Sequence, residues 1–196
     1  MDKEINESGR RTVLHIRGMV CPRCIMAVRK VLSDAGVEPL SVELGRATVE
    51  GILPTDAMSR ISAGLDALGF SLIEDRRTAE AEMIKTAVIE FIHCPGQPQK
   101  QPLSSYLAAT LHREYSHLSK LFSETTGTTI EQYFIAQKVE RVKELIEYGD
   151  MTMSEIADRL GYSSTAHLSA QFKKHTGMTP SEYRSHQTPR TPIDRL

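Results

Sequence analysis

His117-Leu118-Ser119-x-x-Phe122-x-x-x-Thr126-Gly127-x-Thr129-x-x-x-Tyr133 recurs as His167-Leu168-Ser169-x-x-Phe172-x-x-x-Thr176-Gly177-x-Thr179-x-x-x-Tyr183. All eight marked residues are identical at one offset, which indicates a duplicated structural unit. The leucine and phenylalanine are four residues apart in each copy, so both face inward on a helix. Two similar helical units in one chain favour two similar surfaces that read one repetitive partner.

From Leu103 onward the sequence predicts helices. Three capping boxes, in which a threonine pairs with a carboxylate three residues later, each open a helix. They are predicted at Thr128 with Glu131, Thr152 with Glu155, and Thr179 with Glu182. Gly127 and Gly177 fit helix C-termini.

In the second copy, a short helix over about 154–160 is followed by a turn at Gly161 and a longer helix that starts near Ser164, with Ser163 as a plausible N-cap. Helix, glycine turn and helix form the helix-turn-helix pattern. Small polar side chains near the start of such a helix contact base edges, and lysines neutralise phosphates. The predicted DNA-binding residues are Ser116, Ser119 and Lys120 in the first copy, and Ser163, Ser164, Thr165, Ser169, Lys173 and Lys174 in the second.

One amphipathic helix, from Thr129 to about Tyr148, joins the two copies. It is about 30 Å long, close to the roughly 34 Å between successive major grooves on one face of DNA. A monomer could therefore place two recognition helices in adjacent grooves. The alternative is a helical-repeat protein that binds another protein, although two copies are few for a solenoid.

The residues from 154 onward, Ser-Glu-Ile-Ala-x-x-Leu-Gly-Tyr, together with His-Leu-Ser-x-x-Phe-Lys-Lys-x-Thr-Gly-x-Thr-Pro-x-x-Tyr-Arg from 167, resemble the signature of AraC/XylS-type regulators. The resemblance covers about 79–185. It implies two helix-turn-helix units joined by a long helix, binding to double-stranded promoter DNA and, in many members, recruitment of RNA polymerase. Alanine stands at position 170, where many members have arginine, so guanine readout from that position is not expected.

Residues 11–75 predict strand, helix, strand, strand, helix and strand, the ferredoxin-like plan. Leu40, Val42 and Leu44 alternate before Gly45 and so predict one strand of a hairpin. The fold class is therefore α+β. A ferredoxin-like domain is expected over 1–76 and an all-α double helix-turn-helix domain over 77–196, in which 77–102 form a connecting helix and loop.

The segment Gly18-Met19-Val20-Cys21-Pro22-Arg23-Cys24 lies between the first strand and the first helix. Pro22 suits the first helical position, and the helix N-terminus together with Arg23 favours thiolates at Cys21 and Cys24. Two thiolates at this spacing suit a soft cation. Copper(I) fits best, and zinc(II), silver(I) and mercury(II) are the other candidates.

This loop resembles the GMxCxxC signature of heavy-metal-associated domains in copper chaperones and P-type ATPases. The resemblance covers about 11–76 and implies that Cys21 and Cys24 are metal ligands, that Met19 is a buried anchor and that Phe70 shields the site. Three alternatives remain: a dithiol redox switch, a dimerisation or packing module, or a module that binds another ligand. Cys94 could complete a trigonal site or be inert packing.

A chain of 196 residues holds one or two domains. Its net charge is −1, it has three cysteines, and its start is polar, so we expect a cytoplasmic protein with no membrane partner and no disulfide framework. No catalytic constellation stands out, so we do not expect an enzyme. The sequence predicts a transcriptional regulator, a monomer or homodimer, that senses a soft metal. The alternative is a metal-delivery protein whose helical half docks a partner protein.

Overall fold

The computed structural model describes residues 11–93 and 101–186. The chain divides into two compact units, Met1–Thr86 and Ala87–Leu196, hereafter the amino-terminal and carboxy-terminal units. The division falls within a single helix, α3 (Arg76–His93), whereas the sequence pattern placed it at the start of that helix. Within the described ranges, no helix combines the length and the apolar character needed to span a membrane.

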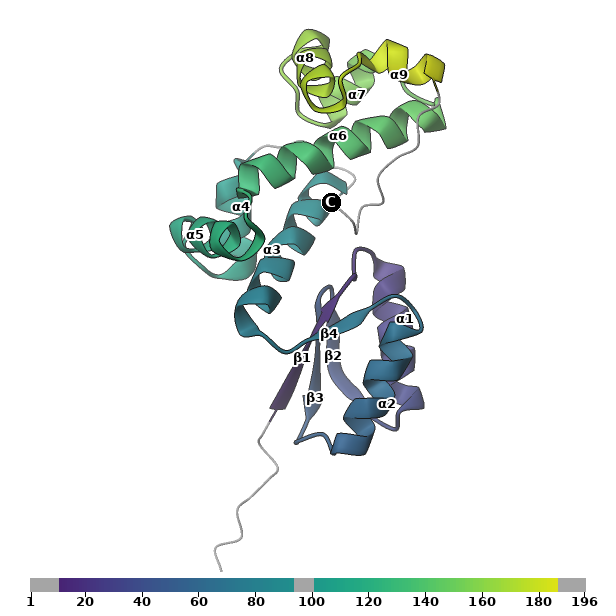
Figure 1. Ribbon diagram of the computed structural model, residues 1–196, viewed down its shortest axis with the longest axis vertical. Coiled ribbons are helices and arrows are strands. Elements are labelled where there is room, and N and C mark those ends of the chain that lie inside the picture. The colour runs from purple at the N-terminus through teal and green to yellow at the C-terminus, as the bar shows by residue number, and fades with distance from the viewer. Residues whose placement is uncertain (1–10, 94–100, 187–196) are drawn as a thin grey trace, which may run out of the picture. The chain divides into compact units, whose positions relative to one another are not determined.

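The amino-terminal unit is a four-stranded antiparallel sheet with two helices (Figure 1). Its elements follow the predicted order: β1 (Arg11–Arg17), α1 (Pro22–Asp34), β2 (Pro39–Glu43), β3 (Arg46–Glu50), α2 (Thr55–Asp66) and β4 (Ser71–Ile73). The strand order across the sheet is β2-β3-β1-β4. The two central strands therefore come from distant parts of the chain, and the loop after β1 leads directly into α1.

One face of this sheet and the two helices enclose the apolar core of the unit. Leu14 and Ile16 point into it from β1 because alternate residues of a strand face the same side. Leu32 and Ile61, which are fully buried, face them from α1 and α2. The helices pack closely enough that a Cβ atom on Gly64 would lie 2.8 Å from a methyl group of Val31.

The predicted alternation in β2 is wrong at Leu40. Val42 is buried as expected, but the side chain of Leu40 is 53% exposed. The pairing with β3 runs from Pro39 directly to Ser41, so the register shifts at Leu40. A bulge of this kind inserts an unpaired residue and turns its side chain out of the pleat.

The carboxy-terminal unit is helical, as predicted, and is built around one long helix (Figure 1). Beyond the end of α3 it contains α4 (Leu103–Leu111), α5 (Tyr115–Thr126), α6 (Ile130–Tyr148), α7 (Met153–Arg159), α8 (Thr165–Thr176) and α9 (Pro180–His186). The long helix α6 contacts α5, α8 and α9. It is therefore the common support of both halves of the repeat.

The two copies of the sequence repeat make the same packing contacts. In each copy the phenylalanine is fully buried and its ring lies against the ring of the repeated tyrosine. The ring centroids are 5.7 Å apart for Phe122 and Tyr133, and 5.6 Å apart for Phe172 and Tyr183. Such tilted aromatic pairs are favourable beyond the area that they bury, so each copy carries its own small core.

The repeated threonine and glycine end α5 and α8 in the same way. Thr126 and Thr176 each donate the hydroxyl to the carbonyl of the repeated phenylalanine, at 2.8 and 2.9 Å. Gly127 and Gly177 then adopt left-handed φ values of 73° and 81°, which end a helix at little cost only for glycine. These bonds are local, which explains why the motif repeats so strictly.

The first capping box was predicted one residue too early. Thr129, not Thr128, is the N-cap of α6, and its partner is Gln132. Glu131 instead accepts a hydrogen bond from the Tyr115 hydroxyl. The other two predicted boxes, at Thr152 with Glu155 and at Thr179 with Glu182, are confirmed.

Candidate nucleic-acid interface and thiol pair

Both copies of the repeat contain a helix-turn-helix. In the first, α4 and α5 are joined at His112, a non-glycine residue with a left-handed φ of 52°. In the second, α7 and α8 are joined through Gly161, whose φ is 64°. Only the second turn has a glycine that marks it in the sequence, because a histidine in this conformation carries no turn signature.

The second helix of the second helix-turn-helix, α8, has a side-chain cap that its counterpart α5 lacks. Ser164 is the N-cap, and its hydroxyl accepts a hydrogen bond from the backbone N–H of His167 at 3.1 Å. The prediction of Ser163 as N-cap is wrong, since the Ser163 hydroxyl lies 3.1 Å from His167 Nδ1 instead. In α5 the N-cap position is Glu114, which makes no side-chain cap.

Substitution of Ser164 by alanine should lower the free energy of unfolding of the carboxy-terminal unit by about 1 kcal/mol, because it removes the acceptor for an N-terminal N–H of α8. Urea unfolding followed by circular dichroism measures this. Glu114→Ala is the matched control and should cost much less. Equal costs at the two positions would contradict the capping assignment.

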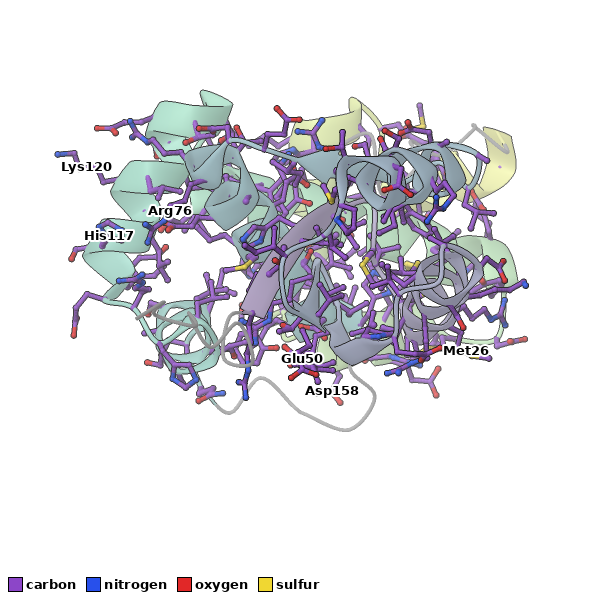
Figure 2. The ribbon with its side chains drawn as sticks, turned by 90° about the horizontal axis from the view of Figure 1, so that it is seen from below. Met26, Glu50, Arg76, His117, Lys120 and Asp158 are labelled. Carbon is purple, nitrogen blue, oxygen red and sulfur yellow. The ribbon has the colours of Figure 1, made fainter. Side chains whose placement is uncertain are left out.

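All nine predicted DNA-binding residues lie on α5, on α8 or in the two residues before α8, and none is buried. Seven are exposed, and Ser119 and Ser169 are half-buried. Lys120 extends from the outer side of α5, as does His117 (Figure 2). Their contacts with bases or phosphates remain predictions.

The helices α5 and α8, which the sequence predicts as recognition helices, differ in charge. The last turn of α8 carries Lys173, Lys174 and His175, all exposed, and the twelve-residue helix contains no carboxylate. In α5 the one lysine, Lys120, lies 4.0 Å from the carboxylate of Glu124. The second copy therefore presents a net positive surface to a polyanion, and the first presents a nearly neutral one.

Tyr162 anchors α8 to the turn before it, a role that the sequence analysis missed. The Tyr162 ring is buried, and its hydroxyl donates to Gln171 Oε1 at 2.8 Å. Its ring also meets the His167 ring edge-on, with centroids 5.4 Å apart. A large aromatic residue directly after the turn glycine was the available signal.

In the amino-terminal unit, the loop after β1 brings two thiols together. Cys21 is the N-cap of α1, Pro22 follows at the first helical position, and the Cys24 N–H donates to the Cys21 carbonyl at 2.9 Å. The two Sγ atoms are 3.5 Å apart, and both side chains are half-buried. The helical turn itself therefore sets the spacing of the pair.

The surroundings of Cys21 favour its thiolate. Burial opposes ionisation, but hydrogen bonds from the Cys24 backbone, the Cys24 thiol and the Arg23 backbone, together with the charge of Arg23, lower the pKa of Cys21. A thiol with a lowered pKa is the better metal ligand and nucleophile.

Met19 is buried as expected, and Phe70 packs near the start of the loop; whether Phe70 shields a site stays a prediction. Met19 is 1% exposed and packs in the core. Phe70 packs at the edge of the same core, and its ring lies so near Gly18 that a Cβ atom there would approach it to 3.3 Å. The loop is therefore anchored in the core by Met19, and the Phe70 ring packs near Gly18 at its start.

The spacing of the two sulfurs is compatible with one shared metal ion. Zinc–sulfur bonds of about 2.3 Å in a tetrahedron place two sulfurs about 3.8 Å apart, close to the 3.5 Å found between Cys21 and Cys24. Over the described ranges, no cluster of three or more histidine, cysteine or carboxylate side chains could hold a metal. Cys94, the suggested third ligand, lies outside those ranges. The pair alone does not provide the four ligands of a structural zinc site.

Comparison with known proteins finds a family match in the carboxy-terminal unit. Residues 107–186 match the family model described as "Helix-turn-helix domain". The xylose operon regulatory protein of Escherichia coli (strain K12) is 33% identical over 119 residues, which are 58% of this chain and 29% of that protein. An uncharacterized HTH-type transcriptional regulator of Staphylococcus aureus (strain MSSA476) is 38% identical over 69 residues, 35% of this chain and 9% of that protein.

The C-terminal domain of AraT, a response regulator from Geobacillus stearothermophilus, is similar in structure, with a TM-score of 0.48 and 23% identity over 60% of this chain and 92% of that one. The chain spans less than a third of the length of the two curated relatives described above. The match to the family model runs from within α4 to the end of α9. Residues 107–186 are therefore similar to helix-turn-helix domains, and the two curated relatives described above are both named as regulators.

Proposed function

We propose that this protein regulates transcription by binding promoter DNA through both helix-turn-helix units, under the control of a soft metal ion bound at Cys21 and Cys24. The observation that carries the DNA-binding part is the repeated packing on one helix. Phe122 packs against Tyr133 of α6, and Phe172 packs against Tyr183 of α9, which is the following helix in each copy. The long helix α6 contacts α5, α8 and α9.

The length of α6 supports simultaneous reading of two grooves. Its 19 residues extend about 28 Å, and one turn of DNA is about 34 Å. Sequence-specific affinity would come from the exposed polar residues at the start of α8, and non-specific affinity from Lys173 and Lys174. RNA polymerase is a further proposed partner.

The metal-sensing part is supported by the thiol pair and its loop. Cys21 and Cys24 would hold a soft ion such as copper(I), Met19 would anchor the loop and Phe70 would limit access of water. The bound ion would neutralise the negative charge of the thiolates. Metal binding changes DNA affinity only to the extent that it favours one arrangement of the protein over another.

The test is DNA affinity measured anaerobically with and without copper(I), for the wild type and for Cys21→Ser/Cys24→Ser. We expect copper(I) to change the wild-type affinity by about 5-fold or more, a typical coupling, and to leave the variant unchanged. Met58→Leu, which leaves both thiols in place, is the control. Equal affinities in all four conditions would remove metal sensing and leave DNA binding intact.

The 3.5 Å separation of the two sulfurs favours a second candidate, a dithiol switch. In that reaction the Cys21 thiolate attacks a small disulfide such as glutathione disulfide, and Cys24 then displaces the bound half. The protein loses two electrons and two protons, and two glutathione thiols are released. Mass spectrometry after glutathione disulfide treatment tests it, because closure of the Cys21–Cys24 bond lowers the mass by two hydrogens, whereas a purely metal-binding pair stays reduced.

A further inference from the structure

Lys138 is the only charged side chain classed as buried within residues 11–93 and 101–186. It lies on α6 and is 6% exposed. Its Nζ atom lies 3.8 Å from the centroid of the Tyr162 ring and 5.3 Å from that of the Phe134 ring. The ammonium group is therefore held between one aromatic ring of α6 and one of the second helix-turn-helix.

Burial at this position imposes a desolvation cost on a cation. Burial lowers the pKa of Lys138 to about 8, and no ion pair with Lys138 is found among the residues that the structure describes. Cation–π attraction offsets part of the desolvation cost. An apolar side chain of similar length would fill the same space without that cost, so the charge itself contributes something other than stability.

The charge restricts the angle at which the lysine side chain meets the aromatic ring. A cation is attracted to the face of a ring, whereas an apolar chain packs equally well at several angles. The Tyr162 ring is in turn fixed to α8 by its hydroxyl bond to Gln171 and by the ring of His167. Phe134 is tied to the end of α3 by the Phe91 ring, 5.9 Å away. An aromatic contact thus runs from α6 through Lys138 to α8.

We propose that Lys138 and Tyr162 are positioning residues that set the angle of α8 against α6, and thereby the spacing at which the two recognition helices engage DNA. This inference rests on the proposed DNA-binding function. Neither residue needs to contact DNA. Because the two residues fix the angle between the helices, one recognition helix can bind its half-site only when the other half-site lies at the matching spacing.

The experiment uses DNA duplexes that the wild-type chain selects from a random-sequence pool. Derivatives carry one or two base pairs inserted between the two half-sites, and each inserted pair rotates one half-site by about 35° relative to the other. We expect one insertion to weaken wild-type binding by about 10-fold or more, because a rigid pair of modules loses simultaneous engagement. In Lys138→Met the same insertion should cost less than about 3-fold.

Two further variants separate positioning from packing. Lys138→Arg restores a cation over the ring and should restore the wild-type insertion penalty. Lys143→Met is the matched control, because Lys143 lies on the same helix but pairs with Glu140 and is 5.9 Å from its nearest ring. It should keep the wild-type penalty.

Thermal unfolding completes the test, because Lys138→Met should unfold as cooperatively as the wild type and at no lower temperature. An insertion penalty in Lys138→Met equal to that of the wild type would overturn the proposal. So would loss of cooperative unfolding, since the lysine would then be needed for stability. If the wild type selects no duplex at all, the DNA-binding proposal itself fails, which is a different outcome.

Discussion

Phe172→Ala should destabilise the carboxy-terminal unit by about 3–5 kcal/mol and abolish specific DNA binding. The Phe172 side chain is 1% exposed and forms the centre of the second small core, against Tyr183. A loss of this size is a large part of the stability of an ordinary domain. The cavity would loosen α8 from α9, which the Tyr183 hydroxyl joins to Glu147 of α6, so the recognition helix would no longer be held in place.

Urea unfolding and DNA titration of the same preparation measure both effects. Phe122→Ala is the matched variant, because Phe122 is equally buried and lies in the same position of the first copy. Comparison of the two variants shows how much DNA affinity each helix-turn-helix supplies. Reaction of Cys21 and Cys24 with a thiol reagent should stay unchanged in both and serves as the control for the amino-terminal unit. Wild-type DNA affinity in Phe172→Ala would refute the assignment of α8 as a recognition helix.

The double substitution of Lys173 and Lys174 by alanine should flatten the salt dependence of DNA binding. Each neutralised phosphate contributes a slope of about −0.9 to a plot of log affinity against log salt concentration. Both lysines are exposed on a helix without carboxylates. Loss of both should therefore reduce the slope by about 1.8 and weaken binding on all sequences alike.

Affinities at four salt concentrations between 50 and 200 mM, roughly the range in which such slopes are defined, give the measurement. Lys120→Ala should reduce the slope by less than about 0.9, because Glu124 already lies 4.0 Å from that ammonium group. Lys30→Ala, an exposed lysine of the amino-terminal unit, should not change it. An unchanged slope in the double variant would show that phosphates meet another face of the protein.

The errors of sequence interpretation are small and local. Thr128 and Ser163 each precede the true N-cap by one residue. The sequence offers adjacent hydroxyl residues at both places, and only backbone geometry decides which one precedes the first helical turn. Leu40 was placed inward because a bulge is invisible to an alternation rule.

The candidate site divides in the same way. The nine predicted DNA-binding residues and the two cysteines come from short-range patterns, and each lies on or next to the helix to which the pattern assigned it. His112 escaped notice because a left-handed histidine leaves no pattern, and Lys138 because charged residues are expected at the surface.

Short-range chemistry was enough to define the repeat, because its members act within a few residues of one another. Thr126 bonds to Phe122, Gly127 ends the helix, and Thr129 starts the next. Contacts over long distances in the chain decided the rest. Lys138 and Tyr162 meet only because α6 carries the second helix-turn-helix against its side, and that contact depends on the packing of whole helices. Periodicity shows that a side chain faces inward, whereas only the assembled fold determines what it meets there.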